Sequence, residues 1–231
     1  MISIYYKQKK FKLNYFSKYF INYFYLIDLG LHFGGHNKSK HMSNTSLIYG
    51  LQNNQTILNL TKTLYELKKV LKILETISFK RGVIYFVNSY LSFQLICKNL
   101  FGFFNKYLLT RKKKLLEYIY IFSKWPAGFL TNNTIYFNSL KYKIKFPRLP
   151  HFGFLLDHFV NFISLKELKK LYIPYSSLLD VTFFNLNTSF YGLVSNGKSI
   201  DSSMFYLFNC LNSFYIGYYN EKLKFKWRLK N

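Results

Sequence analysis

The sequence predicts an α/β domain, namely a three-layer, doubly wound parallel sheet of the Rossmann or flavodoxin-like kind. Short apolar runs typical of buried strands alternate with longer segments of helical periodicity. Two of these runs end in a carboxylate, at Asp157 and Asp180. Strands that alternate with helices pair in parallel, and right-handed crossovers place helices on both faces of the sheet.

In the first half of the chain, the short apolar run 55–60 precedes a predicted helix over 61–79. Leucines recur in this helix at helical spacing, and the lysines lie mostly on other faces. The dipeptide Arg81-Gly82 is expected to end it. Residues 83–87 (VIYFV) then predict a buried strand, and residues 89–101 a further helix.

In the second half, residues 153–157 (GFLLD) predict a strand that ends at a carboxylate. A helix is expected over 163–172, and Pro174 prevents it from continuing. Residues 176–180 (SSLLD) predict another strand of the same kind. The uncharged stretch that begins at Ser199 is expected to form the last helix.

The charge of the chain points to an anionic partner. Its 33 Lys and Arg residues face only 9 Asp and Glu residues, which gives a net charge of +24. A fold this basic repels itself unless it lies against something negative. Nucleic acid is the leading candidate, and an anionic membrane surface is the second.

The residue usage points to a very AT-rich gene. Phe and Tyr alone supply 48 residues, as 26 plus 22, whereas Ala127 is the single alanine. Helix propensity cannot explain the loss of the best helix former. Organelle genomes commonly have such composition, and the first eighty residues contain no arginine of the kind that imported presequences carry. We therefore expect a mitochondrial matrix protein that is encoded by the organelle.

The cysteines and the apolar stretches suggest neither a disulfide framework nor a membrane span. Cys97 and Cys210 are far apart in the sequence and fit a reducing compartment. Residues 202–220 carry no charge but include several Ser and Asn residues, which is a poor match to a spanning helix. We expect no integral membrane insertion.

The segment 26–41, LIDLGLHFGGHNKSKH, is the most conspicuous candidate for a chemical site. His32, His36 and His41 have approximately helical spacing, but the two adjacent glycines between the first two disfavour a zinc-binding helix. The glycines are better explained by close backbone approach to another segment or to a phosphate. Neither this segment nor SNGKS (195–199) has the spacing of a nucleotide-binding loop.

No nucleophile motif stands out, so the sequence predicts no enzyme activity, no metal, no cofactor and no small-molecule substrate. Two alternatives stay open. One is a basic membrane-associated protein, and the other is a nucleotide-binding α/β enzyme.

Taken in order, the motifs resemble those of the bacterial-type small-subunit ribosomal protein S2 family. The family's G-x-H-F-G-H signature is matched at Gly30, His32, Phe33 and Gly34, and an aromatic-glycine pair follows at Tyr49-Gly50. TILNLTKT and RGVIYFVNS are similar to its next two motifs. KWPAGFLTN is similar to R-W-L-G-G-x-L-T-N through Trp125, Gly128, Leu130, Thr131 and Asn132. The last motif extends over 149–174 and includes Asp157, Glu167, Ile173 and Pro174, with Asp180 at a further family position.

The chain departs from the family pattern in several places. The family's long helical hairpin is lost, or reduced to a basic loop, between Asn132 and Leu149, and 98–124 is an extended basic insertion. We expect a basic aromatic N-terminal arm over 1–25, one α/β ribosomal-protein domain over 26–220 and a basic tail over 221–231. As a strand, the tail would place its lysines on one face and its apolar residues on the other.

The resemblance implies a structural constituent of the small ribosomal subunit, a ribonucleoprotein that supports translation. Its implied partners are small-subunit ribosomal RNA and neighbouring ribosomal proteins. Basic segments with interleaved aromatic residues suit folded RNA through phosphate contacts and stacking. The candidate RNA-binding residues are Lys9, Lys10, His36, Asn37, Lys38, Lys40, Arg111, Lys112, Lys113, Lys114, Lys124, Lys141, Lys143, Lys145, Lys222, Lys224, Lys226 and Arg228.

Overall fold

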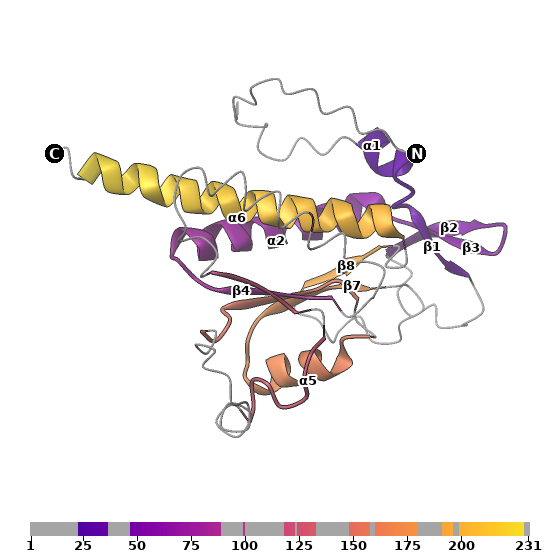
Figure 1. The fold of residues 1–231 in the computed structure, drawn as a ribbon. Helices are drawn as coiled ribbons and strands as arrows, with labels where there is room; N and C mark the ends of the chain where they lie inside the picture. Colours follow the sequence, from indigo (N-terminus) through magenta and orange to yellow (C-terminus); the bar gives the residue numbers. More distant parts are fainter. Residues whose placement is uncertain are drawn as a thin grey trace.

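A five-stranded parallel sheet forms the centre of the computed structural model (Figure 1). The structure describes residues 23–36, 47–88, 99, 118–122, 124–132, 148–157, 160–179, 191–195 and 199–228. The strands of the sheet are β4 (Ile84–Val87), β5 (Ile119–Phe122), β6 (Phe152–Leu155), β7 (Tyr175–Leu179) and β8 (Tyr191–Val194). Their spatial order is β5-β4-β6-β7-β8. Counted along the chain this is the order 2-1-3-4-5, which is that of flavodoxin-like domains.

Helices cover both faces of this sheet, as the sequence predicts. The helices α2 (Leu60–Phe79) and α6 (Ile200–Arg228) pack together on one face. The helix α5 (Phe162–Lys170) lies on the other face (Figure 1). This arrangement confirms the three-layer α/β class. Of the helix predicted over 89–101, only Asn99 lies among the described residues, and it is helical.

A second, smaller sheet precedes α2 and is not anticipated by the sequence analysis. The short helix α1 (Tyr23–Asp28) leads to β1 (Phe33–His36), β2 (Ile48–Gln52) and β3 (Gln55–Leu58), which form an antiparallel sheet in the order β1-β3-β2. Asn53 and Asn54 join β2 to β3 with φ angles of 48° and 61°. Asparagine tolerates this left-handed conformation, which a two-residue hairpin turn requires.

Two ranges that were set apart in the sequence analysis contain parts of the main fold. Strand β5 lies inside the range 98–124 that was expected to be an insertion, so residues 119–122 form an edge of the main sheet. Helix α6 continues without interruption to Arg228, so residues 221–228 of the basic tail are helical. Lysine and arginine are good helix formers, and cations near a helix C-terminus interact favourably with its dipole.

The ends of α2 show how local sequence sets an element's limits. Asn59 precedes the helix, and its side-chain oxygen accepts a hydrogen bond from the Thr61 N–H at 3.2 Å. At the other end Arg81 has a φ of 58°, and the Gly82 N–H donates to the Ile77 carbonyl at 2.8 Å. A Cβ atom on Gly82 would lie 2.5 Å from the Ile77 side chain. The predicted stop at Arg81-Gly82 is therefore confirmed.

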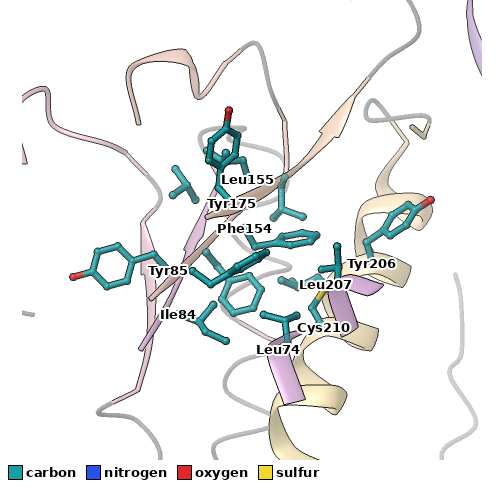
Figure 2. Packing of buried hydrophobic residues seen from close by; sticks show 14 of the residues in the cluster. Leu74, Ile84, Tyr85, Phe154, Leu155, Tyr175, Tyr206, Leu207 and Cys210 are labelled. Carbon is teal, nitrogen blue, oxygen red and sulfur yellow. The ribbon is translucent and has the colours of Figure 1, made fainter. Parts of the chain in front are cut away.

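The core lies between the parallel sheet and the α2–α6 pair. Figure 2 shows Leu74 of α2 together with Leu207 and Cys210 of α6 beside Ile84 and Phe154 of the sheet. All five side chains are buried. The opposite face of the sheet is equally tight, because a Cβ atom on Gly153 would lie 2.7 Å from Leu168 of α5. Close packing on both faces fixes the positions of the strand ends.

We expect the stability of the fold to decline steeply in alkaline solution. Burial raises the pKa of Tyr175 to about 12, and it also raises the pKa values of the Tyr85 and Tyr206 phenols and the Cys210 thiol. The unfolded chain therefore releases these protons first, at about pH 9–10, so the free energy of unfolding falls as the pH rises from there toward 12. Thermal unfolding measured across this pH range tests the expectation.

The Tyr175→Phe variant is the control for the alkaline effect. It removes one of the titrating phenols, so its stability should depend less on pH above about pH 10 than that of the parent chain. A melting temperature of the parent chain that stays constant between about pH 9 and pH 11 would contradict the assignment.

Candidate nucleic-acid interface

Among the sequence-predicted RNA-binding residues, only Lys124 has a described side chain, and it is exposed just after β5. His36 ends β1, and Lys222, Lys224, Lys226 and Arg228 belong to the last two turns of α6, where the structure describes the backbone alone. The remaining candidates lie outside the described residues, namely Lys9, Lys10, Asn37, Lys38, Lys40, Arg111, Lys112, Lys113, Lys114, Lys141, Lys143 and Lys145.

The glycine-rich segment of β1 makes a close backbone contact with β3. A Cβ atom on Gly34 would lie 2.1 Å from the Thr56 hydroxyl oxygen and 3.1 Å from the Thr56 carbonyl oxygen. Only glycine permits this approach. The sequence analysis left two explanations for these glycines, close approach to another segment or to a phosphate. The contact at Gly34 supports the first. The preceding His32 ring lies 3.9 Å from the Phe33 ring, centroid to centroid.

The loop 124–132 is held in place by a single buried carboxylate of α5. Glu167 accepts hydrogen bonds from the Trp125 indole N–H at 3.2 Å, the Gly128 N–H at 2.7 Å and the Leu130 N–H at 2.8 Å. Gly128 has a φ of 83°, which a residue with a side chain rarely adopts. Two of the segments that carry the family resemblance, 124–132 and 149–174, thus meet at Glu167.

Aromatic side chains pack the same loop against the sheet. The Trp125 ring lies 5.0 Å from Phe122 and 5.3 Å from Phe129, and Phe122 lies 4.9 Å from Tyr85 of β4. Such edge-to-face clusters add to the stability gained from burial alone. The exposed Lys124 lies at the start of this anchored loop. A lysine on the surface can neutralise a phosphate.

The strand order reverses between β4 and β6, and doubly wound enzymes bind their ligands beyond the carboxyl ends of the strands at such a point. Here polar groups of the chain bond to one another just after β6. Asp157 follows β6, and its carboxylate accepts a hydrogen bond from the Val160 N–H at 3.0 Å. The Asn161 side-chain amide donates to the Asp157 carbonyl at 2.7 Å. Asp157 therefore shapes the turn that leads to α5, and Asp180 lies outside the described residues.

Exposed lysines that the sequence analysis did not single out lie on both faces of the sheet. On α2 they are Lys62, Lys68 and Lys72, close to two carboxylates in the same helix. The Lys69 ammonium lies 2.8 Å from the Glu66 carboxylate, and this hydrogen bond raises the pKa of Lys69. On α5 the lysines are Lys166, Lys169 and Lys170. Their position opposite the leucines of each helix is visible in the helical periodicity.

None of the described helices is long and apolar enough to cross a membrane.

Fold and surface together define a class of protein, a basic α/β domain of flavodoxin-like topology. Comparison with known proteins identifies the family within this class. The family model described as ribosomal protein S2 matches residues 26–145, which is slightly more than half of the 231 residues. The chain belongs to the ribosomal protein S2 family, as its motifs suggest.

Two relatives illustrate the similarity. The small ribosomal subunit protein uS2 of Ehrlichia chaffeensis (strain ATCC CRL-10679 / Arkansas) is 26% identical over 179 residues, with 67% of this chain and 62% of the relative covered. The corresponding protein of Ehrlichia ruminantium (strain Gardel) is 25% identical over 179 residues, with 67% and 63% covered. The chain thus covers less than two thirds of the length of these relatives.

Proposed function

We propose that this protein is a structural, non-enzymatic constituent of a small ribosomal subunit, where it binds ribosomal RNA and neighbouring ribosomal proteins. The observation that carries the proposal is the family match over residues 26–145. The net charge of +24 supports it, because charge on this scale favours binding to a polyanion. The relatives are named as proteins of the small ribosomal subunit. In this proposal, the flavodoxin-like domain is the scaffold that carries the basic segments.

In this proposal, the basic residues identified from the sequence act through the RNA backbone. Lysine neutralises phosphates and releases condensed counterions, which gives affinity without sequence readout. The exposed Lys124 sits on the loop held by Glu167, and the four cations of the last turns of α6 continue a helix that Figure 1 shows projecting past α2. Both elements present charge from folded structure.

We expect the purified full-length chain to bind small-subunit ribosomal RNA with a strong dependence on salt. Four or more phosphate contacts predict an affinity loss of about 100-fold or more between about 50 and about 200 mM monovalent salt. Filter binding or fluorescence anisotropy over a salt series measures the slope. A slope near zero would remove RNA from the proposal.

Sedimentation tests the assignment to the particle. The protein should co-sediment with the small subunit in a high-magnesium gradient, and RNase treatment with salt should release it. Recovery of the chain in the lipid fraction after the same treatment would favour the basic membrane-associated alternative. Specific nucleotide binding by the purified chain would favour the enzyme alternative.

We further propose that the particle is a mitochondrial ribosome and that the gene lies in organelle DNA. The support is compositional, since an alanine-poor chain rich in Phe and Tyr is typical of a very AT-rich gene. Localisation of the gene to mitochondrial or nuclear DNA, with cell fractionation of the protein, tests this point. A nuclear gene whose product fractionates away from mitochondria would contradict it.

A further inference from the structure

The outward side of α5 carries a stripe of exposed basic, aromatic and aliphatic residues, which we call the α5 stripe. Its members are Phe162, Ile163, Lys166, Lys169, Lys170 and, just beyond the helix, Tyr172. The helix members recur at intervals of three, four and seven residues and so share one side of α5. The inward residues Ser164, Leu165, Glu167 and Leu168 are buried.

Tyr172 combines a left-handed backbone with an exposed side chain. Its φ is 55°, a conformation that is disfavoured for residues other than glycine. Its N–H donates to the Lys169 carbonyl at 3.0 Å, so the helix end requires this turn of the backbone. The side chain is 88% exposed and therefore adds little to the core. The Tyr172 ring is therefore exposed to solvent on a residue whose backbone conformation is energetically unfavourable.

The charge of the α5 stripe is uncompensated. Lys166, Lys169 and Lys170 form no ion pair with any carboxylate in the described part of the chain. Glu167, the acidic residue of α5, points inward and binds the loop 124–132. The Lys166 ammonium lies 4.5 Å from the centroid of the Phe162 ring, which places a cation next to an aromatic face. Positive charge beside exposed aromatic rings complements a partner that is anionic and has planar rings available for stacking.

We propose that the α5 stripe is an RNA-contact surface, in which Lys166, Lys169 and Lys170 bind phosphates and Tyr172 stacks on an unpaired base. The inference rests on the proposed ribosomal function. It adds a surface that lies on the opposite face of the sheet from α2 and α6 (Figure 1). None of its residues belongs to the set identified from the sequence. RNA fits better than a protein partner because every charged residue of the stripe is positive and exposed aromatic rings lie among them, whereas α2 also carries Glu66 and Glu75.

Two charge-matched triple variants test the role of the lysines. The first combines Lys166→Gln, Lys169→Gln and Lys170→Gln, and the second combines Lys62→Gln, Lys68→Gln and Lys72→Gln on α2. Both remove three exposed charges from helices, but from opposite faces of the sheet. With full-length chain and small-subunit ribosomal RNA transcript as the probe, the first should reduce the slope of log affinity against log salt by about 2–3. The second should change it by less than about 1.

Two substitutions of Tyr172 test the stacking. Tyr172→Gly removes the ring and suits the left-handed backbone, so the chain should fold at least as well while its affinity for the RNA falls roughly tenfold. Tyr172→Phe keeps the ring and should retain the parent affinity. Zero-length ultraviolet cross-linking of the assembled subunit should then yield a nucleotide adduct on the peptide that contains Tyr172.

The outcomes separate this inference from the proposed function. A parent chain that fails to bind the RNA would remove the function and the inference together. Strong binding by the parent with equal losses in the two triple variants would leave the function standing and overturn the α5 stripe. The stripe would also be overturned if Tyr172→Gly binds like the parent, or if the Tyr172 peptide cross-links to protein instead of RNA.

Discussion

Gly217→Ala is expected to destabilise the protein by about 2–3 kcal/mol, although alanine in a helix is ordinarily about 1 kcal/mol better than glycine. Gly217 lies where α6 crosses α2 at close range. A Cβ atom there would lie 2.2 Å from the Glu75 carbonyl oxygen and 3.0 Å from the Glu75 Cα. These are backbone atoms and cannot move aside as a side chain could, so the two helices must separate by roughly 1 Å and lose contacts along their length.

Chemical denaturation of the parent and the variant measures the difference in the free energy of unfolding. In thermal unfolding, the same difference should lower the melting temperature of a chain of this size by about 5–10 °C. Gly50→Ala is the matched control. Gly50 lies in β2, and a Cβ atom there would meet nothing within 4 Å, so the same chemical change should be close to neutral. If Gly217→Ala is as stable as Gly50→Ala, the close crossing of α2 and α6 is wrong.

Glu167→Ala is expected to have the other large effect, a loss of about 3–5 kcal/mol. The substitution leaves the buried Leu130 N–H, the Gly128 N–H and the Trp125 indole N–H without their acceptor. Glu167→Gln should lose less, about 1–3 kcal/mol. The amide oxygen can still accept at one position, but the NH₂ group then faces an N–H donor at the other.

Urea denaturation reports the stability of the Glu167 variants. In a Trp227→Phe background, where Trp125 is the single tryptophan, fluorescence reports the local environment of the loop. In Glu167→Ala the Trp125 emission should shift to longer wavelength, because the indole loses its partner and the loop its anchor. The shift should be smaller in Glu167→Gln, whose amide oxygen can still accept from the indole N–H. Glu66→Gln is the control, since its carboxylate pairs with Lys69 at the surface and should contribute less than about 1 kcal/mol. Equal stabilities of Glu66→Gln and Glu167→Gln would show that Glu167 does not anchor the loop.

Elements whose pattern is strong within one segment could be predicted from the sequence. The helix α2 has leucines at a regular spacing and a stop at Arg81-Gly82, so its extent was predicted to within one residue at its start. Strands β4, β6 and β7 are uniformly apolar or small because both faces of the sheet are covered, and each was found to within about two residues. The family motifs agreed with these elements and gave the fold class directly.

Elements that depend on their neighbours could not be predicted. Strand β1 reads FGGH, and glycine is depleted in strands, yet Gly34 is extended because the backbone of β3 lies against it. Strand β5 is short and only partly buried, and it exists because β4 offers a free edge in register with Ile119. The tail after residue 220 alternates basic and apolar residues, which favours a strand, but the helix already formed upstream extends through it at little cost.

Some features of the candidate site could likewise be predicted from the sequence, and others could not. The basic segments were visible in the sequence, since a charge excess needs no folding to be recognised. The role of Glu167 was not visible, because its three hydrogen-bond donors lie 37 to 42 residues away in the chain. The α5 stripe likewise required the structure, which shows that Glu167 points inward and that Tyr172 is exposed in a left-handed conformation.

Periodicity, motif order and net charge are properties of the linear chain, so they sufficed to predict the α/β class, the family and a polyanionic partner. Only the tertiary structure decided the strand order, the edge position of β5, the close crossing at Gly217 and the placement of lysines on opposite faces of the sheet. The physical reason is that these features depend on contacts between residues far apart in the chain. Their free energies come from packing and from buried hydrogen bonds, which local sequence patterns do not encode.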